Sequence, residues 1–314
     1  MSSTGEDQTA WTVGRLLDWT TAWLQQKQIE GGRLSAELLL ARALDCKKID
    51  LYTRYDVQPT DEQRSTFREL VRRAANHTPI AYLLGSREFF SLEFAVSPAV
   101  VIPRPETEAL VQRMIELCRQ TPDRTWQILD VGTGSGCIAV AIAKYTRNTL
   151  IVAGDVSAPA LAVAAGNVER HGLQDRVRLV EADCVNLPPE VVPPGGFDAI
   201  VSNPPYISEK AFATLPPAIR DHEPKVGLTI AGTDGLVMYR RFAKEAPPVL
   251  APGGRLLIEI GHDQHAAVLE IFKSAGNWTY IGSHRDPSDP YDRVVEYQER
   301  GSSRRPGGAR PAVV

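Results

Sequence analysis

The four consecutive residues Asn203, Pro204, Pro205 and Tyr206 form the most chemically specific motif of the sequence, and they follow a short apolar run. Proline has no N–H to donate and fixes φ, so a strand cannot continue through two prolines in succession. The side-chain oxygen of Asn203 and the carbonyl oxygen of Pro204 can each accept one N–H of a planar –NH2 group, which favours attack by its nitrogen on an electrophilic methyl group. Tyr206 can stack on the planar group and exclude water.

This chemistry needs positioning and preorganised dipoles rather than a strong base, because the product sheds its proton readily after transfer. We therefore interpret Asn203, Pro204 and Tyr206 as catalytic, and residues 203–206 as the substrate-binding segment. The structural alternative is a rigid Asn-Pro-Pro turn with Tyr206 as a lid on the core. The position of the motif directly after an apolar strand favours the functional interpretation, because ligands bind at strand ends in parallel sheets.

A second motif, the loop DVGTGSG at 130–136, has three glycines at alternate positions. Glycine permits a sharp turn and lets a ligand approach where a Cβ would collide. We expect five loop residues to bind a cofactor: Gly132, Thr133, Gly134, Ser135 and Gly136. The loop alone leaves the nucleotide open, because Gly134, Gly136 and Ala139 also satisfy the loose G-x-G-x-x-G/A dinucleotide pattern.

Acidic residues end two further apolar runs. Asp155 lies about 20 residues beyond the glycine loop, where an acid binds ribose hydroxyls in nucleotide-binding folds. The alternative role of Asp155 is to cap the helix that opens near Ser157. The next run, 177–180, leads into Glu181-Ala182-Asp183-Cys184, and a carboxylate there, such as that of Asp183, can accept the exocyclic amine of an adenine. A solvated loop acid is the competing interpretation of Asp183.

These motifs lie at the ends of strands in a region where strands and helices alternate. Strands are expected at 128–131, 150–155, 177–180, 197–202 and 256–260, and helices near 137–145, 157–170, 234–249 and 263–275. The alternation implies right-handed crossovers and a mostly parallel sheet with both faces covered. The sequence therefore predicts an α/β fold with a doubly wound sheet, and ligands beyond the carboxyl ends of its strands.

Before residue 105, the spacing of apolar residues follows two other patterns. From Thr12 to about Ala75 apolar residues recur on helical faces, and Thr60 with Gln63 predicts a capping box. From residue 86 apolar and polar residues alternate, and Ser97-Pro98 interrupts them before the apolar run 100–102, which predicts a β-hairpin. We predict a disordered start (1–9), a helical substrate-docking domain (10–85), a β-hairpin linker (86–104), a catalytic domain (105–299) and a disordered tail (300–314).

Composition limits the possible partners and compartments. Lys and Arg total 35 against 38 for Asp and Glu, a net charge of −3 over 314 residues. Proteins that grip duplex nucleic acid are normally basic, so stable nucleic-acid binding is not expected. The four cysteines lie far apart with no His at metal spacing, which disfavours disulfides and a metal site. With no run of ~18 apolar residues and no signal pattern, we expect a cytoplasmic protein without a membrane contact.

The motifs together resemble those of the S-adenosylmethionine-dependent methyltransferases of the Rossmann-like class. This resemblance rests on DVGTGSG, Asp155 and Asn-Pro-Pro-Tyr. Two more segments, PIAYLLG at 79–85 and IPRPETE at 102–108, narrow the resemblance to the release-factor glutamine methyltransferases, the PrmC/HemK family. The similarity extends as far as residues 292–295 and leaves out only the two tails.

The resemblance implies a Rossmann-like methyltransferase fold, S-adenosyl-L-methionine as cofactor, and N-methylation of the glutamine in the Gly-Gly-Gln motif of class 1 peptide chain release factors. It implies cofactor contacts from the glycine loop, Asp155, Asp183, Cys184 and Asn203. It also implies substrate contacts from residues 203–206. The family often carries an aromatic residue where this chain has Cys184. The His222-Glu223-Pro224 and 232–236 segments look like the family's loop that shapes the substrate entrance.

Three hypotheses about function stay open. The favoured one is methylation of release factors by a monomeric cytoplasmic enzyme, and a sister activity on a glutamine of a large-subunit ribosomal protein would use the same chemistry. An adenine methyltransferase acting on nucleic acid is permitted by Asn-Pro-Pro-Tyr, but such enzymes need a phosphate-binding surface. A non-enzymatic or nicotinamide-binding Rossmann protein would use the glycine loop alone and leave the motif as a turn.

Overall fold

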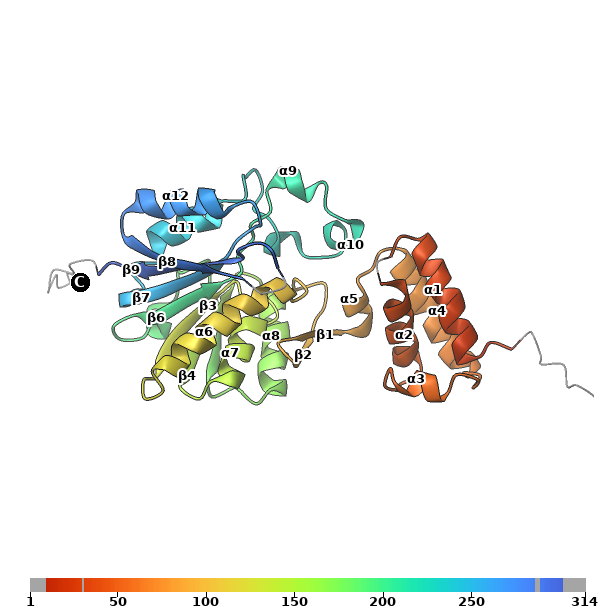
Figure 1. Ribbon diagram of the computed structural model, residues 1–314. Coiled ribbons are helices and arrows are strands. Elements are labelled where there is room, and N and C mark those ends of the chain that lie inside the picture. Colours follow the sequence, from red (N-terminus) through yellow and green to blue (C-terminus); the bar gives the residue numbers. More distant parts are fainter. Residues whose placement is uncertain (1–9, 30, 286–288, 302–314) are drawn as a thin grey trace, which may run out of the picture. The chain divides into compact units, whose positions relative to one another are not determined.

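The computed structural model describes residues 10–29, 31–285 and 289–301. The chain divides into two compact units (Figure 1): the residues up to Ser86 together with Pro216–His222, and Arg87–Leu215 together with the residues from Glu223 onward. The predicted disordered ends, 1–9 and 300–314, lie outside the described residues except for residues 300 and 301. In the described part, no helix combines the length and apolar character needed to cross a membrane.

The first unit is a bundle of short helices around one apolar core. Its helices are α1 (Val13–Gln26), α2 (Gly32–Ala43), α3 (Asp50–Thr53), α4 (Asp61–Ala75) and α5 (Ile80–Leu84). The short α10 (Pro217–Arg220) also belongs to this unit but has no buried residue. Leu17, Leu39 and Phe67 are among the buried side chains that recur on one helix face and pack together. The predicted capping box is present: Thr60 Oγ1 accepts from the N–H of Gln63 at 3.2 Å, and Gln63 Oε1 accepts from the N–H of Thr60 at 3.0 Å.

The second unit is built on a mostly parallel sheet, which in the described residues has seven strands in the order β5-β4-β3-β6-β7-β9-β8. The strands are β3 (Trp126–Val131), β4 (Thr149–Asp155), β5 (Val177–Glu181), β6 (Phe197–Ser202), β7 (Leu250–Glu259), β8 (Trp278–His284) and β9 (Val294–Glu299). The first five strands of this order pair in parallel, and β9 runs antiparallel to both neighbours. The predicted α/β fold with a doubly wound sheet is confirmed.

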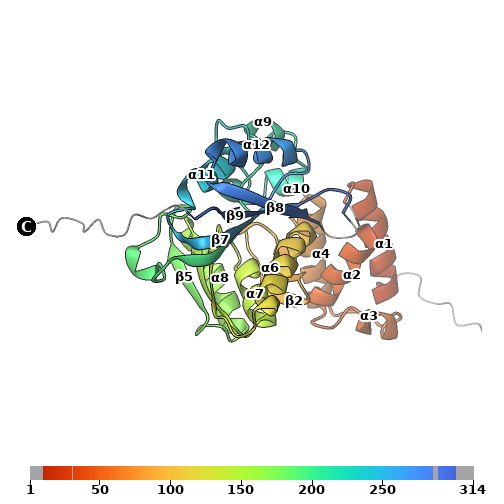
Figure 2. The ribbon, with the colours of Figure 1, turned by 60° about the vertical axis from the view of Figure 1, so that its left-hand side comes forward.

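Helices cover both faces of this sheet (Figures 1 and 2). One face is covered by α6 (Glu108–Gln120), α7 (Cys137–Tyr145) and α8 (Ala158–Arg170), and the other by α11 (Val237–Glu245) and α12 (His265–Ala275). Successive strand residues alternate between the two cores: Ile128 packs in one and Leu129 in the other. Because both faces are buried, the parallel strands appear in the sequence as nearly continuous apolar runs.

The sequence pattern does not predict β8 and β9, which extend one edge of the sheet. β9 carries the buried carboxylate of Glu296 within its run, and a charge there removes the apolar pattern that marks a buried strand. This carboxylate is contacted by three side chains: Arg113 Nε at 2.7 Å, Arg255 Nη1 at 3.0 Å and His284 Nε2 at 2.9 Å. Its charge is therefore compensated by residues that are distant in the sequence.

A hairpin of β1 (Ser86–Phe89) and β2 (Leu92–Ala95) precedes the sheet, and the short α9 (Glu209–Phe212) follows β6. The hairpin turn lies at Phe90 and Ser91, and Ser97-Pro98 comes after β2, so 100–102 is not its second strand. Both turn residues have positive φ (51° and 57°), a backbone that fits a two-residue hairpin turn. The N–H of Phe90 donates to Glu108 Oε1 at 2.9 Å, which holds this strained turn.

The strand register brings the two sequence motifs to one edge of the sheet. Val131, the last residue of β3, lies beside Gly154 of β4 and beside Ser202 of β6. The hydroxyl of Ser202 donates to the carbonyl oxygen of Val131 at 2.7 Å. The glycine loop and the Asn-Pro-Pro-Tyr segment therefore start from neighbouring strand ends, where the strand order reverses.

Candidate active site

The glycine loop is joined directly to Asp155 at the end of β4. Gly132, Gly134 and Gly136 all have positive φ (72°, 54° and 80°), which favours glycine at each position. The N–H of Gly134 donates to Asp155 Oδ2 at 2.9 Å, and the N–H of Ser157 donates to Asp155 Oδ1 at 3.0 Å. Ser157, not Asp155, is the N-cap of α8. The carboxylate of Asp155 thus fixes the loop and keeps lone pairs for further donors.

Two buried polar atoms near this loop have no partner among the described residues: Asp130 Oδ1 and Ser135 Oγ. Asp130 Oδ2 accepts from the hydroxyl of Thr133 at 2.7 Å, and burial raises the pKa of Asp130 to about 7. Buried polar atoms are normally hydrogen-bonded in native proteins. An unmet acceptor and an unmet hydroxyl in a glycine-rich loop fit a polar ligand that carries both donors and acceptors.

Asn167 of α8 holds the other side of the loop. Its Nδ2 donates to the carbonyl oxygens of Ser135 at 2.8 Å and Ala95 at 3.0 Å, and its Oδ1 accepts from the N–H of Ala95 at 2.7 Å. The side chain is fully buried and its hydrogen-bonding groups are satisfied. Asn167 therefore links the glycine loop to β2 of the hairpin.

The amide of Asn203 has a defined orientation. Its Nδ2 donates to Thr107 Oγ1 at 3.0 Å. Among the described residues, nothing donates to Asn203 Oδ1 or to the carbonyl oxygen of Pro204. The Asn-Pro-Pro-Tyr segment thus presents two unused acceptors beside the glycine loop.

A buried carboxylate supports both Asn203 and Tyr206. Glu259 ends β7, and its Oε2 accepts from the hydroxyl of Thr107 at 2.6 Å while its Oε1 accepts from the hydroxyl of Tyr206 at 3.3 Å. Burial raises the pKa of Glu259 to about 7, and burial also raises the pKa of Tyr206. The result is a continuous chain of hydrogen bonds from Asn203 through Thr107 and Glu259 to Tyr206.

The backbone of Tyr206 is held by a second set of contacts. Gln264 Nε2 donates to the carbonyl oxygen of Tyr206 at 2.9 Å, and Gln264 Oε1 accepts from Tyr239 at 3.0 Å. Gly235, with a φ of 79°, lies so close that a Cβ there would be 2.3 Å from the same carbonyl oxygen. Both the ring and the main chain of Tyr206 are therefore fixed by contacts within the second unit.

We expect Glu259→Gln to reduce the pH dependence of stability. Folding raises the pKa of Glu259 from 4.5 to about 7, so the folded state favours the protonated carboxyl. This stabilisation is complete below pH 4.5 and is lost as the pH rises to about 7. Urea unfolding at pH 5 and pH 8 should show that the wild type loses roughly 2–3 kcal/mol more than the variant.

Asp130 titrates in the same pH range in both proteins, so the comparison between wild type and variant isolates Glu259. Equal losses of unfolding free energy for the two proteins would contradict a carboxyl that is protonated by burial. The Gln side chain retains a carbonyl acceptor for one of the two hydroxyl donors, Thr107 or Tyr206, and has nearly the same volume as glutamic acid.

Asp183 and Cys184 follow β5, next to the end of β4, since the N–H of Ala182 donates to the carbonyl oxygen of Asp155 at 3.0 Å. The Asp183 carboxylate is exposed and forms a bidentate pair with Arg241 of α11, at 2.7 and 3.1 Å. The Cys184 side chain is buried in the core, and its φ is 56°. At this position the backbone, more than either side chain, is free to contact a ligand.

The segment 102–104 is joined to the loop after β6. Glu223 accepts from the N–H of Ile102 at 3.2 Å and from the guanidinium of Arg104. The Glu223 side chain is buried, so this ion pair and hydrogen bond compensate a charge that is otherwise costly to bury. Glu223 and the 102–108 segment, which both resemble the family pattern, thus contact each other within the second unit.

The sequence motifs do not identify Thr107, Glu259, Asn167 or Gln264 as supporting residues. A signal exists for Glu259, because it is a single acid within the otherwise apolar run LLIEI. A charge within a buried strand requires a partner, and its presence indicates a special role. Thr107 lies within the IPRPETE segment but has no distinctive pattern of its own, and its contact is 152 residues away in the sequence.

Comparisons with known proteins give consistent results. Residues 15–85 match the family described as PrmC N-terminal domain, and residues 106–217 match the family described as methyltransferase small domain. A release factor glutamine methyltransferase of Rhodopirellula baltica is 45% identical over 301 residues, which cover 95% of this chain and 100% of the relative. One of Geobacter sulfurreducens is 41% identical, with 91% and 96% of the two chains covered.

Solved structures resemble the chain at the level of the fold. The hMettl16 catalytic domain is 17% identical, with a TM-score of 0.53, and the match covers 75% of this chain and 82% of that domain. At this identity the likeness supports the methyltransferase fold alone.

Proposed function

The chain belongs to the family of release factor glutamine methyltransferases, and from this premise we propose that it methylates class 1 peptide chain release factors. The reaction transfers a methyl group from S-adenosyl-L-methionine to the side-chain amide nitrogen of the glutamine in the Gly-Gly-Gln motif. The observation that carries this proposal is the pair of unused acceptors, Asn203 Oδ1 and the carbonyl oxygen of Pro204, beside the glycine loop. A carboxamide has two N–H donors for two acceptors.

The residues around the glycine loop fit S-adenosyl-L-methionine. The Gly132–Gly136 loop, which includes Thr133 and Ser135, would hold it, with Asp155 for its ribose. The backbone at Asp183 and Cys184 would complete the site together with Asn203. The unpartnered Asp130 Oδ1 and Ser135 Oγ support a ligand with an ammonium and a carboxylate group. When bound, the cofactor supplies an electrophilic methyl group.

The protein's own groups account for activation of the substrate. Asn203 and Pro204 accept the two N–H groups of the glutamine amide, which aligns its nitrogen and favours pyramidalisation. Thr107 keeps Asn203 Oδ1 available by accepting from Nδ2. Tyr206 is fixed by Glu259, and Pro205 next to it stiffens the segment, so that the ring can cover the amide and exclude water. Preorganised acceptors of this kind stabilise the transition state without reorganisation.

We also propose roles for the rest of the chain. Residues 10–85 would form the substrate-docking domain, residues 86–104 the linker, and residues 105–299 the catalytic domain. The enzyme would act as a monomer in the cytoplasm without a stable nucleic-acid complex, which the net charge of −3 supports. Light scattering after gel filtration and a titration with duplex DNA at 150 mM salt would test these two properties.

The proposed function is tested by letting candidate substrates compete for a labelled methyl group. The protein is incubated with methyl-labelled S-adenosyl-L-methionine and an equal mixture of purified release factor, large-subunit ribosomal proteins and DNA. Mass spectrometry should locate the label on the glutamine of Gly-Gly-Gln. Label on a ribosomal-protein glutamine or on adenine would replace the proposed substrate, and Asn203→Ala serves as the control with strongly reduced turnover.

A further inference from the structure

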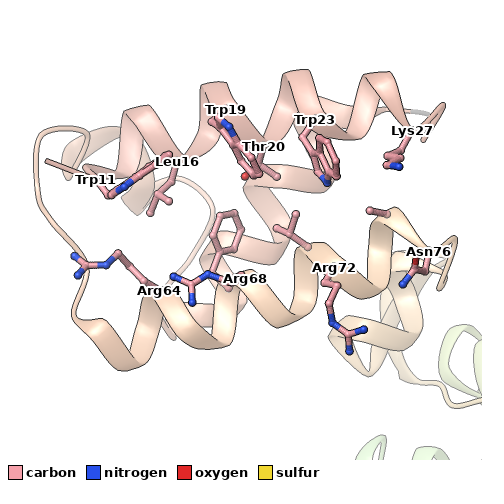
Figure 3. Close-up of a pocket in the computed structure, with 13 residues that line it drawn as sticks. Trp11, Leu16, Trp19, Thr20, Trp23, Lys27, Arg64, Arg68, Arg72 and Asn76 are labelled. Atoms are coloured by element: carbon pink, nitrogen blue, oxygen red, sulfur yellow. The ribbon is translucent and has the colours of Figure 1, made fainter. Parts of the chain in front are cut away.

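The first unit has a groove of about 520 Å³ between α1 and α4 (Figure 3). Its lining includes the buried apolar side chains Leu16, Phe67 and Val71. Tryptophans from α1 and from the residue before its N-cap line one side, and arginines from α4 line the other: Trp11, Trp19, Trp23, Arg64, Arg68 and Arg72. Trp11 and Trp19 are 37% and 51% exposed. Exposed large apolar side chains gathered beside an apolar groove indicate an interaction surface.

The charge of this groove is entirely basic. Its lining contains three arginines of α4 and Lys27, and no Asp or Glu. Arg64 and Arg72 pair with acids three residues earlier on α4. Within the described part of the chain, Arg68 and Lys27 have no carboxylate partner. Because the whole chain has a net charge of −3, this local excess of positive charge favours an acidic partner.

The contacts of the tryptophan rings favour a protein partner over a nucleic acid. Trp19 and Trp23 stack on each other with centroids 5.8 Å apart and an interplanar angle of 14°. Lys27 Nζ lies 4.9 Å from the centroid of Trp23, and the guanidinium carbon of Arg15 lies 4.7 Å from that of Trp11. Nucleobases bind by stacking on open ring faces. These contacts occupy part of the ring faces, and the groove also has an apolar lining, which suits aliphatic side chains.

We propose that this groove docks an acidic amphipathic helix of the protein substrate. The apolar stripe of that helix would lie against Leu16, Phe67 and Val71, and its carboxylates would face Arg68 and Lys27. α1 and α4 have 14 and 15 residues, so the groove matches a helix of about four turns. The inference rests on the proposed function in one respect, since it takes the release factor as the substrate that carries the helix.

Steady-state kinetics of the full chain with purified release factor test this proposal. Arg68→Glu should raise KM for the release factor about tenfold and leave kcat unchanged, since it places like charges at the interface. The matched control is Arg73→Glu, which makes the same charge change on an exposed residue of α4 outside the groove and should change KM less than about twofold. KM for a short Gly-Gly-Gln peptide should be the same in all three proteins.

A carbodiimide cross-link identifies the docked segment, because the reagent joins the Lys27 amine to a carboxylate in contact with it. The cross-linked peptide of the release factor should contain acids spaced three or four residues apart and an apolar stripe. Equal KM values for Arg68→Glu and Arg73→Glu, a cross-link to a segment without this pattern, or displacement of the release factor by single-stranded RNA would each overturn the docking proposal. Absence of turnover by the wild type would instead overturn the proposed function and, with it, the release factor as occupant.

Discussion

Replacing Asn203 with alanine is expected to lower kcat by roughly 100- to 1,000-fold, because it removes one of two acceptors positioned for the substrate amide. The substitution leaves the glycine loop and Asp155 in place, since these contacts do not involve Asn203. Cofactor affinity, measured by calorimetry, should therefore stay within about threefold of the wild type. Turnover of the variant at the wild-type rate would contradict the proposed mechanism.

A companion substitution separates the acceptor itself from its orientation. Thr107→Val removes the hydroxyl that accepts from Asn203 Nδ2, so the amide of Asn203 can rotate and present its nitrogen to the substrate. We expect a loss in kcat of about tenfold, smaller than for Asn203→Ala, and recovery in Thr107→Ser, which restores the hydroxyl. An equal loss in the Val and Ser variants would indicate a packing effect of Thr107 instead.

Replacing Gly134 with valine is expected to weaken cofactor binding by at least about 100-fold, or roughly 2.7 kcal/mol. Gly134 has a φ of 54°, and a Cβ there would meet no protein atom within 4 Å, so the space beside it is open. Its N–H also fixes the loop to Asp155. A branched side chain would fill the open space and displace the loop. Calorimetric titration with S-adenosyl-L-methionine measures the effect.

The matched control is Gly172→Val. Gly172 has a φ of 66°, and a Cβ there would also meet nothing within 4 Å, so the backbone strain of about 1–2 kcal/mol is comparable. Gly172 lies after the C-terminal end of α8, in the turn that leads into β5, away from the strand ends that carry the site. We expect lower thermal stability in both variants and unchanged affinity in the control. Equal affinities in the two variants would mean that the glycine loop does not hold the cofactor.

The parallel core of the fold could be predicted because its signals lie within short stretches of consecutive residues. The central strands β3 and β6 are largely buried on both faces and form apolar runs, and the two motifs follow directly from them. The strand β9 could not be predicted in this way, because the buried Glu296 breaks its pattern and is compensated by Arg113, which is 183 residues away. An ion-pair partner so far away in the sequence cannot be recognised from the residues around Glu296.

The same limit applies to the site. Asn203 and Tyr206 are recognisable from four consecutive residues, but the contact between Thr107 and Glu259 exists only after the sheet has formed. Asp183 is similar: its position after β5 is local information, whereas its pairing with Arg241 of α11 depends on tertiary packing. The helical pattern also does not predict the groove between α1 and α4. That pattern identifies the buried face of α1, whereas the tryptophans that line the groove lie outside that face.

The fixed orientation of the Asn203 amide has a consequence for chemical selectivity. Because Thr107 holds Nδ2 on its side, Asn203 and Pro204 offer the substrate the lone pairs of two oxygens. Glutamate is isosteric with glutamine, but its ionised carboxylate would bring two anionic oxygens against these two oxygens, which is repulsive. Deamidation of the target glutamine to glutamate should therefore prevent its methylation. A release factor damaged in this way would remain unmodified, and no separate proofreading step would be needed.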